Sequence, residues 1–458
     1  MFKTRMVLIM TEAQQKARID NIHVAEGSNR QYLRRIRIRN YLAGQAIYNL
    51  GDYPAKVIAK PTDYDRELVK KMASAGVSLI QLHEDWNDAC RLYGGDKFNA
   101  VDREGMKEFV QLCHAHDIKV IAYVSSGYFQ FDDPDFREEF TAIDRSFANN
   151  YFCYRKGNHG SAAWRSYVIP KTLEAMDYYG FDGIFNDWGY DGHIPGTHCY
   201  MAPGAYDVDV EDMLSQIYGE IKRRGGIYKL HCDRNNPAPC KDQVYDYLWV
   251  GEAITKLQPG IGKEYPGYVV PCQDRHFYDG NTLEDYFAYT IPFLQFPLLK
   301  TGRPIQGKNT RLPNVTYYGG DEQEFYENVG KYMDTHPEGP YVYSLWSSIP
   351  DDPTEFDTWC RYFALYAPMV TENSLAYIEL RSCDAIRSPL PEEVFASMFV
   401  NEETYLVLSN LTGKPYTLEL EGIWKDRQTG KTGNHFTIEH EKLCFLIKQQ
   451  PNYHEKEN

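Results

Sequence analysis

The sequence of 458 residues lacks several features by which a protein class is recognised at once. It contains no run of about 18 consecutive apolar residues, which excludes a membrane-spanning helix. None of its ten cysteines forms a Cys-x-x-Cys pair, so neither a disulfide framework nor a zinc site is expected. Gly-x-Gly-x-x-Gly and His-Glu-x-x-His are also missing, so the sequence predicts no dinucleotide cofactor and no resident metal.

Positive charge is scarce. The chain has 49 Lys and Arg against 64 Asp and Glu, a net charge of −15. Because affinity for nucleic acid depends on basic side chains that neutralise phosphates, we expect no nucleic-acid partner. The apolar run Met6–Met10 follows basic residues but is too short for a secretory signal, and it is followed by polar residues without a cleavage site. These features predict a cytoplasmic protein without a membrane partner.

Aromatic side chains, by contrast, are abundant. They make up 14% of the chain, with 37 Tyr, 22 Phe and 7 Trp. Flat aromatic faces suit the apolar faces of sugar rings, although most aromatic side chains in any protein fill its core.

Short apolar runs alternate with amphipathic stretches from about residue 44 onward. Strands are expected at Ala46–Leu50, Val77–Leu82, Ile118–Val124, Phe181–Phe185, Ile227–Leu230, Tyr247–Val250, Ile291–Phe296 and Tyr341–Trp346. Helices are expected at Tyr64–Ala75, Arg103–His116, Ser166–Tyr179, Glu211–Arg224, Leu283–Tyr289, Glu322–Met333 and Phe356–Tyr366. Strictly alternating strands and helices predict a parallel sheet, and this number of units favours an α/β fold of the (β/α)8 barrel (TIM barrel) type.

The pattern changes at both ends of the chain. Residues 1–40 are polar and form an N-terminal extension, in which Arg35–Arg39 alternates with period two like an exposed strand. The barrel is assigned to residues 41–372. After about residue 373, short strand-like runs separated by turn signals predict an antiparallel β-sandwich domain over residues 373–458.

Polar side chains follow the predicted barrel strands. Since the active sites of barrel enzymes lie at the carboxyl ends of the strands, we expect these side chains to line one pocket. The candidates are His83, Glu84, Asp85, Trp86, Tyr128, Asn186, Asp187, Trp188, His231, Cys232, Asp233, Arg234, Glu252 and Trp346.

Two carboxylates across a barrel mouth suit glycoside hydrolysis, in which one attacks or stabilises the anomeric carbon and the other protonates the leaving oxygen. By position these are Asp187 and Glu252, which follow the fourth and sixth predicted strands. The expected partner is therefore a carbohydrate. Three alternatives stay open: a transglycosidase, a carbohydrate-binding protein on a degenerate barrel, and a metal-dependent isomerase or lyase that uses His83, Asp85 and His231.

Several segments resemble the melibiase-type α-galactosidase clan of retaining glycoside hydrolases. The similar segments are Gly76–Trp86, Asp117–Val124, Tyr179–Asp187, Leu230–Cys232 and Tyr247–Glu252, which keep the family's order over about residues 60–255. The resemblance implies that Asp187 is the nucleophile and Glu252 the general acid and base of an exo-acting α-glycosidase, with Asp85 and Trp86 against the sugar. Phe185 stands where the family has a lysine, and Glu252 replaces an aspartate, so galactose specificity is not expected to carry over.

Overall fold

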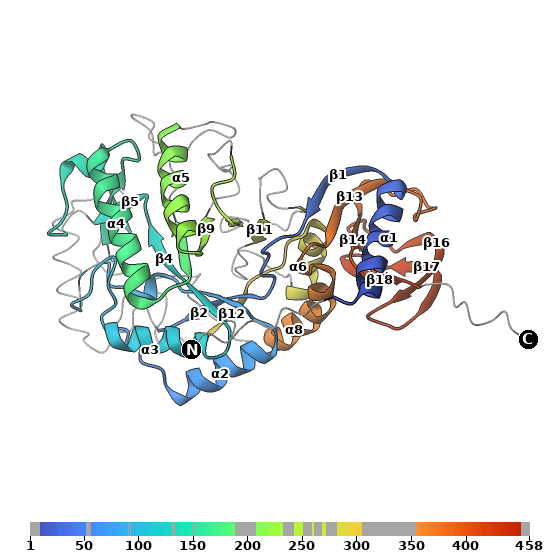
Figure 1. Cartoon of the computed structure of the whole chain (residues 1–458), viewed down its shortest axis with the longest axis horizontal. Coiled ribbons are helices and arrows are strands. Elements are labelled where there is room, and N and C mark those ends of the chain that lie inside the picture. Colours follow the sequence, from blue (N-terminus) through green and yellow to red (C-terminus); the bar gives the residue numbers. More distant parts are fainter. Residues whose placement is uncertain are drawn as a thin grey trace, which may run out of the picture.

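The computed structural model describes residues 10–51, 56–89, 91, 93–130, 133–149, 152–187, 208–231, 242–250, 259–260, 268–271, 282–304 and 354–449. Within these residues, no helix is both long enough and apolar enough to cross a membrane. The chain forms a parallel α/β unit and an antiparallel sheet beside it (Figure 1).

Eight parallel strands form the sheet of the α/β unit, in the order β11-β10-β9-β8-β4-β3-β2-β12. Because the last strand lies beside the first, this is the strand order of a (β/α)8 barrel. The end strands β11 and β12 are not paired with each other in the part of the chain that is described. The strands are β2 (Gln45–Asn49), β3 (Leu79–Gln81), β4 (Lys119–Ser125), β8 (Gly183–Asp187), β9 (Ile227–His231), β10 (Tyr247–Val250), β11 (Tyr268–Pro271) and β12 (Leu299–Gly302).

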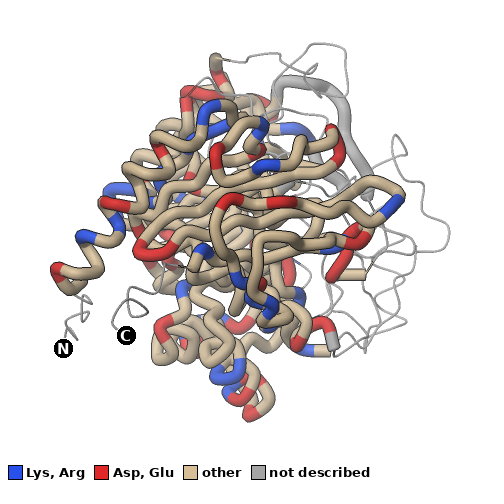
Figure 2. The backbone as a smooth tube through the Cα atoms, turned by 90° about the vertical axis from the view of Figure 1, so that its right-hand side faces the viewer, with Lys and Arg blue, Asp and Glu red and all other residues tan. Residues whose placement is uncertain are grey.

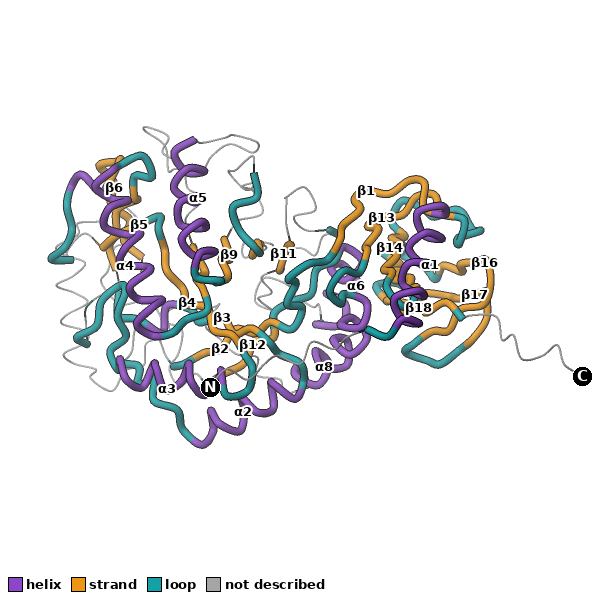
Figure 3. Tube along the Cα trace, in the orientation of Figure 1, coloured by secondary structure: helices purple, strands orange, loops and turns teal. Residues whose placement is uncertain are grey.

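Helices alternate with these strands along the chain, as the purple and orange segments of Figure 3 show. Threonine, aspartate or serine side chains cap the amino ends of four of them, at Thr62, Asp102, Ser161 and Thr282. Such side chains satisfy backbone N–H groups that the first turn leaves without partners. The helices are α2 (Asp63–Ser74), α3 (Arg103–His114), α4 (Ala162–Tyr179), α5 (Val208–Arg223), α6 (Leu283–Thr290) and α8 (Thr354–Tyr366).

The connection between β4 and β8 carries a small antiparallel sheet before α4. It consists of β5 (Tyr128–Gln130), β7 (Phe152–Gly157) and β6 (Thr141–Asn149), paired in that order. Helix α4 ends at Gly180, whose φ of 76° is a left-handed conformation that glycine adopts without a steric penalty. The chain therefore turns sharply from α4 into β8, the strand that ends in Asp187.

The seventh and eighth barrel strands differ from the sequence prediction. Ile291–Phe293 is a 3-10 helix rather than a strand, because Pro292 lacks the N–H that a sheet interior requires. The strand beside β10 is β11, and the strand that pairs with β2 is β12. The strand predicted at 341–346 and the helix predicted at 322–333 lie outside the described residues.

The C-terminal domain is all β, as predicted, but its described strands form one continuous sheet rather than two. Seven strands pair in the order β1-β13-β14-β15-β18-β16-β17. The pairing of β16 with β17 is interrupted between Glu419 and Trp424, and such an irregularity bends a strand locally. The strands are β13 (Leu375–Cys383), β14 (Val394–Val400), β15 (Thr404–Asn410), β16 (Tyr416–Asp426), β17 (Thr432–Ile438) and β18 (Lys442–Lys448).

The N-terminal extension belongs to this C-terminal sheet. Helix α1 (Glu12–Ser28) leads into β1 (Asn29–Arg37), which pairs antiparallel with β13. Strand β1 includes Arg35–Arg37 of the alternating segment Arg35–Arg39, and its last two residues lie beyond the strand. Helix α1 was not predicted. Along the backbone drawn in Figure 2, acidic and basic residues are interspersed and neither kind forms one large block.

Candidate functional site

The strand register places Asp187 between two polar neighbours. In the parallel sheet Asp187 is the register partner of Ser125 on β4, and Asn186 is the partner of Leu230 on β9. His231, the last residue of β9, therefore lies next to Asp187. Because side chains alternate between the two faces of a strand, Asp187 and His231 lie on the same face of the sheet, where they contact each other.

Both oxygens of the Asp187 carboxylate are hydrogen-bonded. His231 Nδ1 lies 2.5 Å from Oδ1, and the Tyr123 hydroxyl donates to Oδ2 at 2.8 Å. The Ser125 hydroxyl donates to the Asp187 backbone carbonyl at 2.9 Å. Donors on a carboxylate stabilise its negative charge and fix its orientation. The side chain of Asp187 keeps 13% of its surface exposed, so it is fixed but accessible.

Two tyrosines connect Asp187 to a second carboxyl group. The Tyr128 hydroxyl donates to Glu84 Oε1 at 2.9 Å, and the hydroxyls of Tyr123 and Tyr128 are 3.3 Å apart. Each hydroxyl gives its single proton to a carboxyl group, so the two hydroxyls are in contact without a further shared proton. Glu84, Tyr128, Tyr123 and Asp187 thus form a continuous chain of polar contacts, which we call the carboxyl–tyrosine chain. Burial raises the pKa of Glu84 to about 7, and the Asp187 charge adds to this effect. A carboxyl group in this range can hold or release a proton near neutral pH.

A buried lysine accompanies this chain. Lys97 is 3% exposed, and its ammonium lies 3.9 Å from the centre of the Tyr128 ring. Burial lowers the pKa of Lys97 to about 7, against the opposing effect of the charges on Glu84, Asp187 and Asp133. No sequence pattern marks Lys97, because it lies in an irregular loop between the Glu84–Trp86 turn and α3.

Hydrogen bonds hold that loop in place. Asp88 Oδ2 accepts from the backbone N–H groups of Tyr93 and Gly95, at 2.7 and 3.0 Å. The guanidinium of Arg91 donates twice to Asp133, at 2.7 and 3.0 Å, which ties the loop to the segment after β5. A loop anchored in this way can present Lys97 in one position.

Tyr123 also escaped the sequence analysis, although a signal was present. It lies two residues before Ser125 on β4, so it shares the face of the strand end that carries the site. The sequence analysis considered only the residues that end each strand.

His83, predicted to contact the sugar, lies buried inside the barrel. It is 2% exposed and packs against Tyr123, Phe185 and Trp249. Its Nε2 lies 3.2 Å from the Gln81 amide nitrogen. Burial lowers the pKa of His83 to about 3, so the ring is neutral. We therefore assign His83 to the packing below the site.

Asp85 and Trp86, which the resemblance placed against the sugar, are fully enclosed. Asp85 is 0% exposed and accepts a hydrogen bond from the Leu50 backbone N–H at 2.5 Å. Trp86 is 1% exposed, packs edge-on against Tyr179 and Phe181, and donates its indole N–H to a backbone carbonyl. Both end the 3-10 turn Glu84–Trp86 in the core. Their contacts correct the predicted sugar contact to a supporting role, because Asp85 binds the backbone after β2 and Trp86 is held by its aromatic neighbours and its own hydrogen bond.

Asn186 is likewise satisfied within the protein. Its amide donates to the hydroxyls of Ser126 and Tyr228, at 2.8 and 2.6 Å, and its carbonyl accepts from the Ser126 backbone N–H. It fixes the strand end beside Asp187 instead of facing a ligand.

Six predicted site residues lie outside the described residues, so their positions stay predictions. They are Trp188, Cys232, Asp233, Arg234, Glu252 and Trp346. A metal site from His83, Asp85 and His231 is not supported, since no group of three or more such side chains gathers within the described part of the chain.

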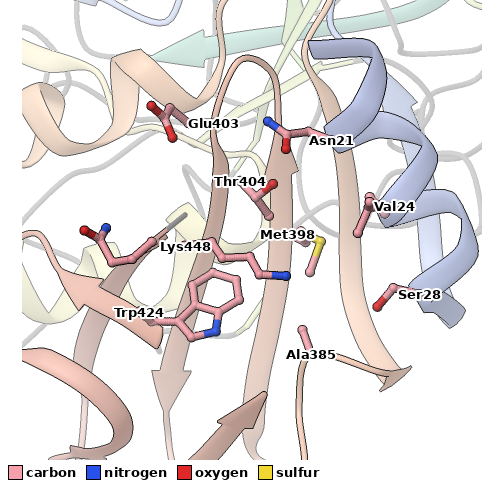
Figure 4. A pocket seen from close by; sticks show the side chains of 11 residues that line it. Asn21, Val24, Ser28, Ala385, Met398, Glu403, Thr404, Trp424 and Lys448 are labelled. Atoms are coloured by element: carbon pink, nitrogen blue, oxygen red, sulfur yellow. The ribbon is translucent and has the colours of Figure 1, made fainter. Parts of the chain in front are cut away.

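A cavity of about 150 Å³ lies away from this site, between α1 and the C-terminal sheet (Figure 4). Trp424 and Met398 line it from the sheet, and Asn21 and Ala25 line it from α1. Trp424 is fully buried, so the cavity reflects loose packing under the helix.

No protein-family model matches the sequence. No curated protein matches it either. The structure, however, is similar to solved structures along most of its length. A noncanonic maltogenic α-amylase from Thermotoga neapolitana aligns with a TM-score of 0.56 at 13% identity, covering 89% of this chain and 99% of that one. This chain has the fold of an α-amylase.

Two further structures support the same fold. An α-amylase from Geobacillus thermoleovorans, solved with acarbose, has a TM-score of 0.52 at 11% identity, covering 90% of this chain and 100% of that one. An α-glucosyl transfer enzyme has a TM-score of 0.56 at 9% identity, covering 92% and 100%. These amylase-type relatives do not support the closer kinship with α-galactosidases that the sequence segments implied. At such low identity the likeness establishes the fold, and function has to be argued from the site.

Proposed function

We propose that this chain is a glycoside hydrolase that acts on α-glycosides with Asp187 as its nucleophile. The observation that carries the proposal is the Asp187 carboxylate at the end of the fourth barrel strand, with one oxygen on His231 and the other on Tyr123. A nucleophilic carboxylate must be ionised and correctly aimed, and two donors serve both purposes. The amylase-type fold, whose named examples act on or transfer α-glucosyl units, supports the reaction class.

The general acid and base is proposed to be Glu252. It follows β10 by two residues along the chain, and barrel enzymes draw their catalytic side chains from such positions after a strand. In a retaining reaction Asp187 attacks the anomeric carbon while Glu252 protonates the leaving oxygen. Glu252 then removes a proton from the incoming water, and the carbon–Asp187 bond breaks.

Variants of the two carboxylates test these roles. Hydrolysis of aryl α-glycosides should fall at least about 1000-fold in Asp187→Ala and in Glu252→Ala, since a residue that forms the covalent bond or moves the proton contributes several kcal/mol. Exposed Glu104→Ala, on α3, is the matched control and should keep full activity.

Azide distinguishes nucleophile from acid. Added to Asp187→Ala, azide attacks the anomeric carbon directly and should give the β-glycosyl azide; added to Glu252→Ala, it should open the covalent intermediate and give the α-azide. Near wild-type activity in either variant, or the same azide anomer from both, would show that the roles are assigned wrongly.

The alternative of glycosyl transfer is favoured by one observation, the fold similarity to an α-glucosyl transfer enzyme. Both reactions share the covalent intermediate and differ only in whether water or a second sugar attacks it. The ratio of oligosaccharide to free sugar, measured against acceptor concentration, separates them.

A further inference from the structure

The feature that the proposed chemistry leaves unexplained is the ammonium group of Lys97. An ammonium group carries three N–H donors and is strongly hydrated in water. Among the described residues, no acceptor hydrogen-bonds to Lys97 Nζ, and its one described close contact is the face of the Tyr128 ring at 3.9 Å. The side chain is nevertheless 97% buried, since only 3% of its surface is exposed.

Such an arrangement destabilises the folded protein. Burying a charge without hydrogen bonds costs free energy, and the cation–ring contact recovers only part of it. The carboxyl–tyrosine chain compensates the charge at longer range, because Glu84 and Asp187 favour the ammonium form. It does not satisfy the donors. The free energy lost by burying the Lys97 ammonium is recovered when a ligand supplies acceptors for its N–H groups.

The position of the group indicates which ligand that is. Tyr128, over which the ammonium lies, is hydrogen-bonded to Glu84 and touches Tyr123, whose hydroxyl contacts Asp187. Lys97 therefore belongs to the same cluster as the proposed nucleophile. The loop that carries it is anchored at Asp88 and Arg91, so the donors are held in place before a substrate arrives.

We propose, on the basis of the function proposed above, that Lys97 binds the sugar ring attached to the scissile bond by donating hydrogen bonds to adjacent hydroxyl oxygens of that ring. The charges around Lys97 favour a neutral sugar. Two carboxyl groups already lie in the cluster, and an acidic sugar would bring a third negative group beside them.

The test compares Lys97→Met with Lys70→Met, an exposed lysine on α2 as the matched control. Methionine keeps the length of the side chain and removes the three donors. We expect Lys97→Met to raise KM for a neutral aryl α-glycoside on the order of 10- to 100-fold, with a smaller change in kcat, because a hydrogen bond from a charged donor is lost. We also expect its Tm to rise, since an apolar side chain replaces a buried charge. Lys70→Met should change neither.

Deoxy substrates identify the contact. Wild type should lose on the order of 10-fold in kcat/KM on the monodeoxy glycoside that lacks the bound hydroxyl, while Lys97→Met should lose almost nothing further, as expected for two groups that contact each other. An unchanged KM with a lowered Tm would show a structural lysine and overturn the inference. A better kcat/KM on a uronic-acid glycoside than on the neutral one would overturn the preference for a neutral sugar.

Binding separates the two proposals. Calorimetric titration of wild type and Lys97→Met with neutral monosaccharides measures the contribution of Lys97 to sugar affinity without any reaction. Affinity that Lys97→Met weakens supports the inference even if wild type hydrolyses no glycoside, an outcome that defeats the proposed function alone. If wild type hydrolyses glycosides and Lys97→Met binds and cleaves them as well as wild type does, the inference about Lys97 fails alone. Wild type that neither binds nor cleaves any sugar overturns both.

Discussion

At the scale of single residues, neighbouring side chains of the site have different roles: some support the structure, and others are available to a ligand. Glu84, Asp85 and Trp86 are consecutive, yet only Glu84 takes part in the carboxyl–tyrosine chain. Asp85 holds the end of β2 through the Leu50 backbone, and Trp86 fills the core. A short 3-10 turn thus directs three neighbouring side chains to three different environments.

Trp86 provides the first prediction. Trp86→Ala should lower the free energy of unfolding by about 3–5 kcal/mol, because a large buried side chain is removed and leaves a cavity. Trp86→Phe should cost less. Urea denaturation measures both. A ligand-stacking tryptophan would behave in the opposite way, with weakened sugar binding and unchanged stability.

Glu84 should make the stability of the protein depend on pH. Its pKa in the folded protein is raised to about 7 from an ordinary value of 4.5, so the folded protein holds a proton that the unfolded chain releases. Its contribution to stability is therefore complete below about pH 4.5 and is lost as the pH rises to about 7. Glu84→Gln has no such loss, so its stability relative to wild type should increase by about 2–3 kcal/mol between pH 4.5 and pH 7.5.

Denaturation of both proteins across this pH range tests the expectation. Lys97, whose pKa is lowered to about 7, acts in the opposite direction above that pH in wild type, so the comparison is best made below pH 7.5. A constant difference between the two proteins across the range would show that Glu84 titrates normally.

At the scale of elements, α1 packs loosely on the C-terminal sheet. Ala25 is its one fully buried residue among the 17 of the helix, and the cavity of about 150 Å³ lies beneath it. Polar contacts compensate for the sparse apolar packing: Arg18 pairs with Glu402 at 2.8 Å, and the Asn21 amide donates to the Asn401 and Glu402 carbonyls.

Gly27 in this helix offers a stabilising change. A Cβ added there meets no atom within 4 Å, and glycine costs about 1 kcal/mol relative to alanine inside a helix. Gly27→Ala should therefore raise the free energy of unfolding by about 0.5–1 kcal/mol. Gly183→Ala on β8 is the contrasting control and should destabilise, because its Cβ would lie 1.8 Å from the Ile227 carbonyl oxygen. Thermal denaturation of the two variants distinguishes them, and equal effects would contradict the argument.

Local patterns predicted most elements of the barrel correctly, and the exceptions have physical causes. The six barrel strands from β2 to β10 and the helices α2 to α5 follow clear periodicity and capping signals, as at Thr62 and Gly180. Strand β12 has only four residues, Leu299–Gly302, and its pattern is too short to recognise. Helix α1 is polar on most of its surface, so it lacks the apolar stripe from which an amphipathic helix is predicted.

The same limit applies to the site. Asp187, Glu84 and His231 follow strands and were predicted, because strand ends are local features. Lys97 and its contact with Tyr128 depend on the path of a loop, and sequence periodicity carries no information about that path.

At the scale of the whole molecule, segments that precede and follow the barrel in the sequence form one sheet. Strand β1 pairs with β13, and Arg18 donates to the Glu372 carbonyl across 354 residues of chain. Apolar side chains of the same sheet, such as Phe395 and Phe445, join the barrel core. The barrel and the C-terminal domain are therefore coupled through packing and through the chain itself.

Removal of residues 1–37 tests this coupling. β13 would become an unprotected edge strand, and we expect its amide hydrogens, in residues 375–383, to exchange on the order of 100-fold faster. Peptides from β4, in residues 119–125, serve as the internal reference and should change much less. Unaltered exchange in β13 would show that β1 adds nothing to the stability of the sheet.

The position of β1 also determines the order of assembly. A ribosome delivers β1 first and its partner β13 only after the entire barrel has emerged. During that interval the arginine-rich segment has no sheet to join, and its charges keep it solvated and resistant to aggregation. Strand β13, which follows the barrel in the sequence, then pairs with β1, and contacts between residues so far apart in the sequence slow folding.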